Sequence, residues 1–142
     1  MELSNFFDAA SRAKKEYTRC LEPVCRDFGL TQNELAVLLF LNNNPGLDRA
    51  ADIVSCRGIA KSHVSLAVSA LEARNILSRR FDSSDRRVCH LLLTEQGARI
   101  AKAGAARQRQ FFDALYAGIS PGERAQMRAV IQKILENIAS FP

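Results

Sequence analysis

The sequence predicts a mostly α-helical fold with one small β-hairpin. Apolar residues recur at three- and four-residue steps over most of the chain, and several of those stretches begin with helix-capping residues. Two short extended segments flank a turn-rich stretch at residues 82–87. Apolar residues make up 47% of the 142 residues, with only 7 Gly and 4 Pro, so a disordered chain is excluded.

A long first helix is expected over residues 4–28. Its apolar stripe at helical spacing consists of Phe6, Ala10, Ala13, Tyr17 and Leu21. We expect Pro23 to bend or interrupt this helix, because proline lacks an amide hydrogen and its ring clashes with the preceding turn. Gly29 is a natural helix end, since glycine readily adopts the left-handed conformation found there.

The second helix begins with a clear local signal. Thr31 and Glu34 have the spacing of a capping box, in which each side chain accepts the backbone amide of the other residue. The residues of this helix that we expect to face a core are Leu35, Leu38, Leu39 and Leu41. The Asn- and Gly-rich turn at residues 42–46 ends the helix.

Two further short helices are expected between residues 48 and 74. Asp48 is expected to cap a helix that reaches about Cys56, and Gly58 breaks it. The next helix runs from Ala60 to Arg74. Its apolar side consists of Val64, Ala67, Val68 and Leu71.

A hairpin and a long helix follow. Extended segments are expected at residues 76–81 and 88–93, and the charged stretch between them has the composition of an exposed hairpin tip. Thr94 is expected to cap a helix that runs to about Gly118.

The last helix and the first one suggest how copies of the chain associate. Ser120, Pro121 and Glu123 combine a cap, a first-turn proline and a capping-box acid, and the helix they begin runs to about Ala139. Its apolar stripe consists of Met127, Val130, Ile131, Ile134, Leu135 and Ile138. A domain this small has no use for apolar stripes on both end helices, so we expect residues 1–29 and 94–142 to form a homodimer around a central part at about residues 30–93, all within a single domain.

The charge is concentrated in the middle of the chain. Residues 57–87 contain seven basic and three acidic side chains, and six of the seven basic residues are Arg. A basic segment in a compact domain is typical of nucleic-acid-binding proteins, and Arg favours bidentate contacts with phosphate or guanine.

Several other classes of function find no support in the sequence. The longest apolar run, Leu35–Leu41, is much shorter than the roughly 20 residues of a membrane span. The first residues lack a basic stretch followed by an apolar one, so we expect a cytoplasmic protein with no membrane partner. Motifs for a nucleophile, a phosphate loop or paired carboxylates are missing, so we expect no enzyme activity, no catalytic residue and no cofactor.

The four cysteines do not have the spacing of metal ligands. No Cys-x-x-Cys or paired-His motif is present, and neither His63 nor His90 has a ligand cluster in the sequence, so no metal site is expected. A structural place is expected for His90. The thiols are expected to be small buried hydrophobes; the alternative is an oxidant sensor at Cys56 or Cys89, which lie close to arginines in the sequence.

Two short helices, a tight turn and a charged hairpin make a winged helix-turn-helix, flanked here by long dimerisation helices. In such a module the second helix fits the major groove of DNA, while the hairpin, or wing, lies against the adjoining minor groove.

The sequence resembles the multiple antibiotic resistance regulator (MarR) family of bacterial transcription factors over nearly its whole length. The most specific matches are Asp85-Arg86-Arg87 and, after it, Leu93-Thr94-Glu95-Gln96-Gly97, which fit the family's Asp-x-Arg wing and Leu-Thr-x-x-Gly helix start. Three positions depart from the usual pattern: Asn75 replaces a common Gly, Leu66 a frequent Arg and Ala60 a common Ser or Thr cap.

The resemblance implies a set of DNA-binding residues. Arg87 matches the wing arginine that enters the minor groove, and Asp85 matches the acid that braces the wing. Lys61, Ser62, His63 and Ser65 lie where family members touch bases and phosphates. Phosphate contacts are expected for some of Arg79, Arg80 and Arg86, although solvated strand ends would look the same in the sequence.

The function that follows is a dimeric regulator, repressor or activator, that binds double-stranded operator DNA of pseudo-palindromic sequence. The family implies release or capture of DNA when a small-molecule effector binds between the DNA-binding and dimerisation parts. The alternatives are a thiol-switched regulator and a dimeric ligand-binding or protein-interaction module without sequence-specific DNA binding, which Leu66 and Ala60 leave open.

Overall fold

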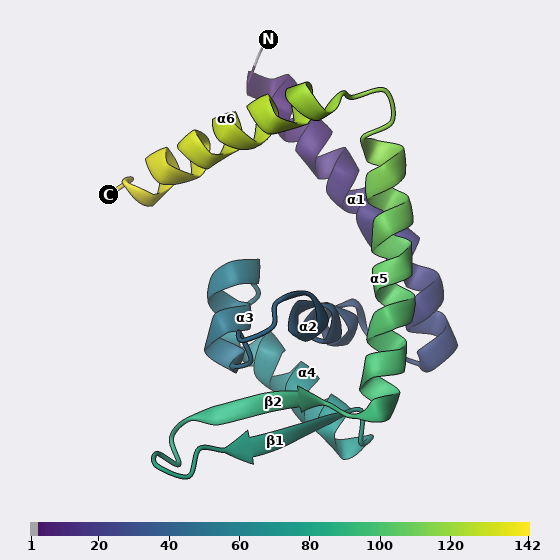
Figure 1. Cartoon of the computed structure of the whole chain (residues 1–142), viewed down its shortest axis with the longest axis vertical. Helices are drawn as coiled ribbons and strands as arrows, with labels where there is room; N and C mark the ends of the chain where they lie inside the picture. The colour runs from purple at the N-terminus through teal and green to yellow at the C-terminus, as the bar shows by residue number, and fades with distance from the viewer. Residues whose placement is uncertain (1–2) are drawn as a thin grey trace. The chain divides into compact units, whose positions relative to one another are not determined.

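The computed structural model describes residues 3–142 and confirms the predicted fold class (Figure 1); the first two residues of the predicted 1–29 segment lie outside the described residues. In chain order the elements are α1 (Leu3–Phe28), α2 (Gln32–Asn43), α3 (Ala50–Arg57), α4 (Lys61–Ala73), β1 (Leu77–Phe81), β2 (Cys89–Leu93), α5 (Glu95–Leu115) and α6 (Pro121–Ala139). Residues up to Phe111 form one compact unit and residues 112–142 form a second one, so the organisation as a single domain stays a prediction. None of the helices within residues 3–142 is long and apolar enough to cross a membrane.

Pro23 does not interrupt α1, so that part of the prediction is wrong. The helix is continuous from Leu3 to Phe28 and contains Pro23 in its interior. Leu21, Val24 and Cys25, on both sides of the proline, are buried in the core. Their packing holds this turn helical and offsets the roughly 3 kcal/mol that an interior proline costs. The helix ends at Gly29, which has a left-handed φ of 63° as predicted.

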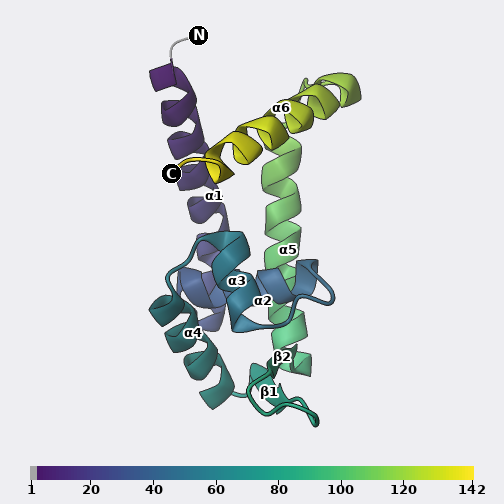
Figure 2. The ribbon, with the colours of Figure 1, turned by 90° about the vertical axis from the view of Figure 1, so that its left-hand side faces the viewer.

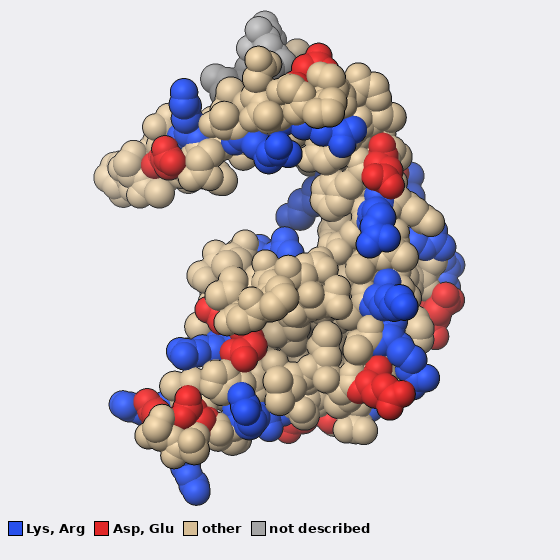
Figure 3. Space-filling view, viewed as in Figure 1, with Lys and Arg blue, Asp and Glu red and all other residues tan. Residues whose placement is uncertain are grey.

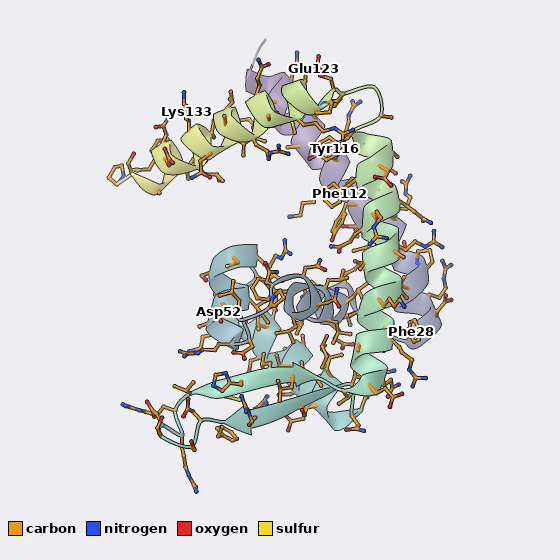
Figure 4. The ribbon with its side chains drawn as sticks, in the orientation of Figure 1. Phe28, Asp52, Phe112, Tyr116, Glu123 and Lys133 are labelled. Atoms are coloured by element: carbon orange, nitrogen blue, oxygen red, sulfur yellow. The ribbon has the colours of Figure 1, made fainter. Side chains whose placement is uncertain are left out.

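Local capping determines where α2 and α3 lie in the sequence. The capping box of α2 is confirmed: Thr31 Oγ1 accepts from the Glu34 amide at 3.1 Å, and the Thr31 amide donates to Glu34 Oε2 at 3.3 Å. α3 ends at Gly58, whose φ is 64°. At the start of α3, the backbone amide of Arg49 donates to Asp52 Oδ2 at 3.0 Å (Asp52 is labelled in Figure 4).

Asp48 does not cap α3, because β2 holds it instead. Its backbone carbonyl accepts from the Leu91 amide at 2.7 Å, and its Oδ1 lies 2.8 Å from His90 Nδ1. The N-cap position of α3 belongs to Arg49. A partner distant in the sequence has therefore replaced the local role that the sequence predicts.

The core of the first unit collects side chains from α1 to α5 and from the base of the hairpin, with α2 at its centre (Figure 2). All four predicted core residues of α4 are buried. In α2, Leu41 is only half-buried, whereas Val37 and Phe40 are fully buried although the helical stripe did not include them. Because α2 packs against α1, α4 and β2, more than one of its faces is covered.

The two strands form an antiparallel hairpin as predicted. Leu77 pairs with Leu93 at its base, Arg80 with His90 further out, and Phe81 with Cys89 at its outer end. Leu77 and Leu91 point into the core. The other face of the strands and the tip extend away from the core.

The hairpin, α4 and α5 meet at one joint. Thr94 Oγ1 lies 2.8 Å from the carbonyl oxygen of Asn75 and 2.9 Å from that of Ile76, and it accepts from the Gly97 amide at 3.1 Å, which confirms Thr94 as the cap of α5. A Cβ at Gly97 would collide with the Ile76 carbonyl oxygen. Asn75 takes the left-handed conformation, with φ 55°, so it serves in the place where the family commonly has Gly.

The second unit contains the end of α5, a turn and α6. The predicted capping box is present: Ser120 Oγ accepts from the Glu123 amide at 3.3 Å, and Glu123 Oε2 accepts from the Ser120 amide at 2.8 Å. Figure 4 labels Glu123 at this helix start, together with Phe112 and Tyr116, whose rings stack with centroids 6.1 Å apart. α6 is described over its full length, and none of its residues is buried.

We expect Gly97→Ala to destabilise the protein by about 1–3 kcal/mol, because the added methyl group must push apart the joint between Ile76 and α5. Urea denaturation at a fixed protomer concentration measures this. The control is Gly122→Ala in α6, where an added Cβ meets no atom within 4 Å. Equal stability of the Gly97 variant and wild type would contradict the importance of the close approach.

Candidate nucleic-acid interface

The N-terminus of α4 is exposed to solvent, and its first backbone amides are accessible to an anion. Ala60 is at the N-cap position and supplies no side-chain hydrogen bond to the first turn. The first amides of a helix carry partial positive charge and have no intrahelical acceptor. Lys61, Ser62 and His63 are exposed beside them. A phosphate group fits such a position.

The outer side of α4 carries small hydroxyls and one large apolar side chain. Ser62, Ser65, Leu66 and Ser69 are all exposed, opposite the buried side of the helix. The acid on this surface, Glu72, forms an ion pair with Arg79, with Nε and Oε2 2.7 Å apart. Arg79 also donates to Ser69 Oγ at 3.2 Å. The outer side of α4 therefore bears no unpaired negative charge over Lys61–Ala73.

The wing motif predicted from the sequence forms a bidentate ion pair. Arg87 Nε lies 3.1 Å from Asp85 Oδ1, Arg87 Nη2 lies 3.3 Å from Asp85 Oδ2, and the Arg87 amide donates to Asp85 Oδ1 at 3.0 Å. These hydrogen bonds hold the pKa of Asp85 below its ordinary value. The Arg87 side chain is nevertheless 91% exposed, so Asp85 orients the guanidinium without covering it.

Arg86 and Arg80 extend the basic surface of the wing. Both side chains are exposed, and neither guanidinium forms a hydrogen bond or ion pair with another residue in the range 3–142. Figure 3 shows basic side chains projecting from the wing, at the lower left, next to acidic ones. The wing therefore presents several guanidinium groups together with the carboxylates that orient its turn.

A network of side chains holds the wing turn in place. Asp82 Oδ1 accepts from the Ser84 amide at 2.9 Å and from Ser84 Oγ at 2.7 Å. These two bonds, with a smaller contribution from His90, lower the pKa of Asp82 to about 2. His90 lies between two carboxylates: its Nδ1 is 2.8 Å from Asp48 and its Nε2 is 3.7 Å from Asp82. The structural place expected for His90 is confirmed.

Some of the arginines counted in the basic segment have structural contacts. Arg74 donates to the carbonyl oxygens of Phe28 at 2.6 Å and Gly29 at 2.8 Å, and so joins the end of α4 to the end of α1. Arg57 lies over the Phe40 ring, 5.6 Å from its centroid. The net charge of a sequence segment does not distinguish arginines with such structural contacts from arginines that are free at the surface.

A cavity of about 390 Å³ lies between α3, α4 and the two strands. Most of its lining is apolar, and three of the predicted DNA-binding residues, Lys61, Ser65 and Arg79, contribute to it. Nothing in the spacing of these residues along the sequence indicates a cavity here. Its complete lining is Ala50, Ala51, Val54, Lys61, Ser65, Val68, Arg79, Cys89 and Leu91.

The cysteines are not equivalent. Cys25 is buried, and desolvation raises the pKa of its thiol, as expected of an unreactive core residue. Cys20 and Cys89 are half-buried and Cys56 is exposed, so the expectation of burial is wrong for Cys56. No group of three or more potential metal ligands occurs within residues 3–142.

The two short helices α3 and α4, of which α4 is buried on one side and exposed on the other, are followed by an arginine-rich hairpin. This arrangement defines a winged helix-turn-helix protein. Residues 28–88 match the model of the MarR family. The transcriptional repressor MprA of Escherichia coli (strain K12) is 24% identical over 111 residues, which are 78% of this chain but only 63% of MprA.

Solved structures have the same fold. The S. aureus MepR–DNA complex aligns with a TM-score of 0.78 and 22% identity over 96% of each chain. CouR from Rhodococcus jostii RHA1, bound to p-coumaroyl-CoA, aligns with a TM-score of 0.73 and 25% identity over 87% of each chain. The chain is thus similar to the MarR family in sequence over residues 28–88 and to solved members of that family in fold.

We expect Ser84→Ala to raise the pKa of Asp82 from about 2 towards the ordinary aspartate value, because the hydroxyl bond is the largest cause of the shift. The stabilisation from this contact is present above the unfolded-state pKa and is lost as the pH falls through about 2. A carboxyl-carbon NMR titration measures the change. Ser83→Ala is the control, and an unshifted Asp82 titration in the Ser84 variant would contradict the assignment.

Proposed function

We propose that the protein is a homodimeric transcriptional regulator that binds a pseudo-palindromic DNA operator through α4 and the wing. The observation that carries this is the exposed outer side of α4, which lies between Lys61 and the wing arginines and carries no unpaired acid. A helix of this kind fits the major groove, and the charge around it suits the phosphate backbone.

Each predicted site residue has a distinct role in the proposal. Lys61 and the uncapped amides of α4 bind phosphate, while Ser62, His63 and Ser65 face base edges. Arg87 enters the minor groove in the orientation set by Asp85, and Arg86 contacts the adjacent backbone. Arg79 acts mainly by neutralising Glu72 and bracing α4 against β1, a role supported by its 2.7 Å ion pair.

The relatives support this choice of function. MprA is named a transcriptional repressor, and MepR has been crystallised with DNA. Because the chain spans less than two thirds of MprA, the activity and the DNA partner of this protein are proposed from its own surface together with those names. In this proposal it acts on DNA in the bacterial cytoplasm and is not an enzyme.

The proposed dimer uses the end helices. α6 exposes an apolar stripe, which a second copy would cover: Val130, Ile131, Ile134, Leu135 and Ile138. A two-fold axis would place the two α4 helices in successive major grooves, about 34 Å apart.

A small-molecule effector is the proposed signal. CouR was crystallised with p-coumaroyl-CoA. In this chain the apolar cavity beside α4 is large enough for a small ligand, and a ligand there would press directly on Lys61 and Ser65. A titration of operator duplex in the presence of small apolar acids, with release of the duplex as the readout, tests this role.

Arg87→Ala should weaken operator binding by about 1–3 kcal/mol and leave the fold intact, because the side chain is almost fully exposed. The measurement is a titration of a duplex from the region upstream of the gene, at fixed salt. Arg26→Ala, at an exposed position in the last turn of α1, serves as the control. Unchanged affinity of the Arg87 variant would sink the wing contact, and failure of wild type to bind any duplex would favour the ligand-binding module.

Ile134→Asp should weaken the dimer by at least about 2 kcal/mol, because the proposed interface would cover the exposed part of this side chain in both copies, and a carboxylate there would lose its water without gaining a partner. Sedimentation equilibrium measures the dissociation constant. Asn137→Asp, an exposed polar position on the same helix, is the matched control. A dimer of unchanged affinity in the Ile134 variant would rule out α6 as the interface.

A further inference from the structure

Leu66 is an exposed apolar residue on the surface proposed to face DNA. Its side chain is 70% exposed, compared with 40% for Leu92 at the base of the wing. The buried side of α4 is complete without it, since Val64, Ala67 and Val68 on both sides of it face the core. The fold of the protomer therefore gives no reason for a leucine at this position.

The charges around Leu66 favour a polyanion as its partner. Lys61 lies one and a half turns before it, the wing arginines lie on the adjoining hairpin, and the acid Glu72 is neutralised by Arg79. An apolar protein surface would gain nothing from that ring of cations, whereas the phosphates on each side of a DNA groove would.

The side chains beside Leu66 indicate which base of the DNA it would contact. Guanine is read by Arg or Lys, and adenine by Asn or Gln, through paired hydrogen bonds in the major groove. Apart from Lys61 at the helix start, which is assigned to phosphate, no outward position of α4 before Glu72 holds Arg, Lys, Asn or Gln; besides Leu66 these positions hold Ser62, His63, Ser65 and Ser69. A serine hydroxyl can donate or accept and so discriminates weakly. An aliphatic side chain has one apolar target on the base edges, the C5-methyl group of thymine.

We propose that Leu66 is a specificity-determining residue that recognises a thymine C5-methyl group in each half-site of the operator. This rests on the proposed function. Contact with the methyl group removes apolar surface of both partners from water. Contact with a G·C pair would instead cover polar groups of the base edge without giving them a hydrogen bond, and that is unfavourable. Leu66 therefore both favours thymine and disfavours G·C at its position.

The test has two arms. One removes the thymine methyl group from the DNA, and the other removes the leucine side chain that would contact it from the protein. Duplexes that bind the full-length chain are selected from a random-sequence pool, and the recovered site is resynthesised with deoxyuridine in place of thymidine, one position at a time. Burial of one methyl group predicts that a single such change, in either half-site, weakens wild-type binding about fourfold. Leu66→Ala removes the contact from both half-sites of the dimer, so it should weaken binding to the thymine duplex by about the square of that factor, roughly 16-fold, and show no further loss on the deoxyuridine duplex.

Two more variants serve as controls. Leu66→Met exchanges the branched leucine for an unbranched apolar chain of similar volume and should keep the sensitivity to deoxyuridine. Leu92→Ala removes an exposed leucine from the base of the wing and should bind like wild type. Because Leu66 is exposed, its variants are expected to stay folded, which circular dichroism checks.

Three results would overturn the inference while leaving the proposed function intact: a selected half-site without thymine, wild-type binding that is indifferent to every deoxyuridine change, or Leu66→Ala binding that keeps the full sensitivity. Absence of binding to every duplex would instead defeat the proposed function, and this inference with it.

Discussion

The structure depends on the close approach between the Ile76 carbonyl and Gly97. At that point the turn after α4, the two strands and the first turn of α5 share the hydrogen bonds of Thr94, and the approach leaves no room for a side chain at Gly97. Because α5 packs on α2 and α2 packs on α4, fixing this joint also fixes the direction in which the outer side of α4 faces. A few backbone atoms thereby hold both the long helix α5 and α4, the helix proposed to read DNA.

The sequence predicted what is decided locally. Some features need only neighbours within a few residues and can therefore be recognised in the sequence. They are the capping boxes of Thr31 and Ser120 and the turn at Asn75. Asp48 and Pro23 were misjudged because distant partners decide their roles: β2 binds Asp48, and core packing on both sides keeps Pro23 helical. Capping propensities and helix-breaking costs of about 1–3 kcal/mol are within reach of such tertiary contacts.

The predicted site residues and their roles stay predictions, but the structure shows which of these side chains are exposed and which already have partners in the protein. The exposure of Lys61, Ser62, His63, Arg86 and Arg87 agrees with a surface site. Arg57, Arg74 and Arg79 belong to the same basic segment, yet they meet an aromatic ring, two carbonyl groups and a carboxylate. The local pattern of the sequence shows that an arginine is charged, but it does not show whether a residue distant in the sequence supplies a partner for the guanidinium. The cavity beside α4 is likewise made by four elements and has no signature in any one of them.

The contact of Arg74 with the last carbonyls of α1 has a consequence for how this protein can evolve. α4 is bounded by the left-handed turn at Gly58 before it and by the Arg74 anchor after it. Each residue added or removed between those points would rotate the later part of the helix by about 100° and turn Leu66 or Ser69 away from the surface proposed to face DNA. Under the proposed function, new DNA sequences can be reached by exchanging outward side chains one at a time, whereas a change in the length of this segment would disrupt the whole surface.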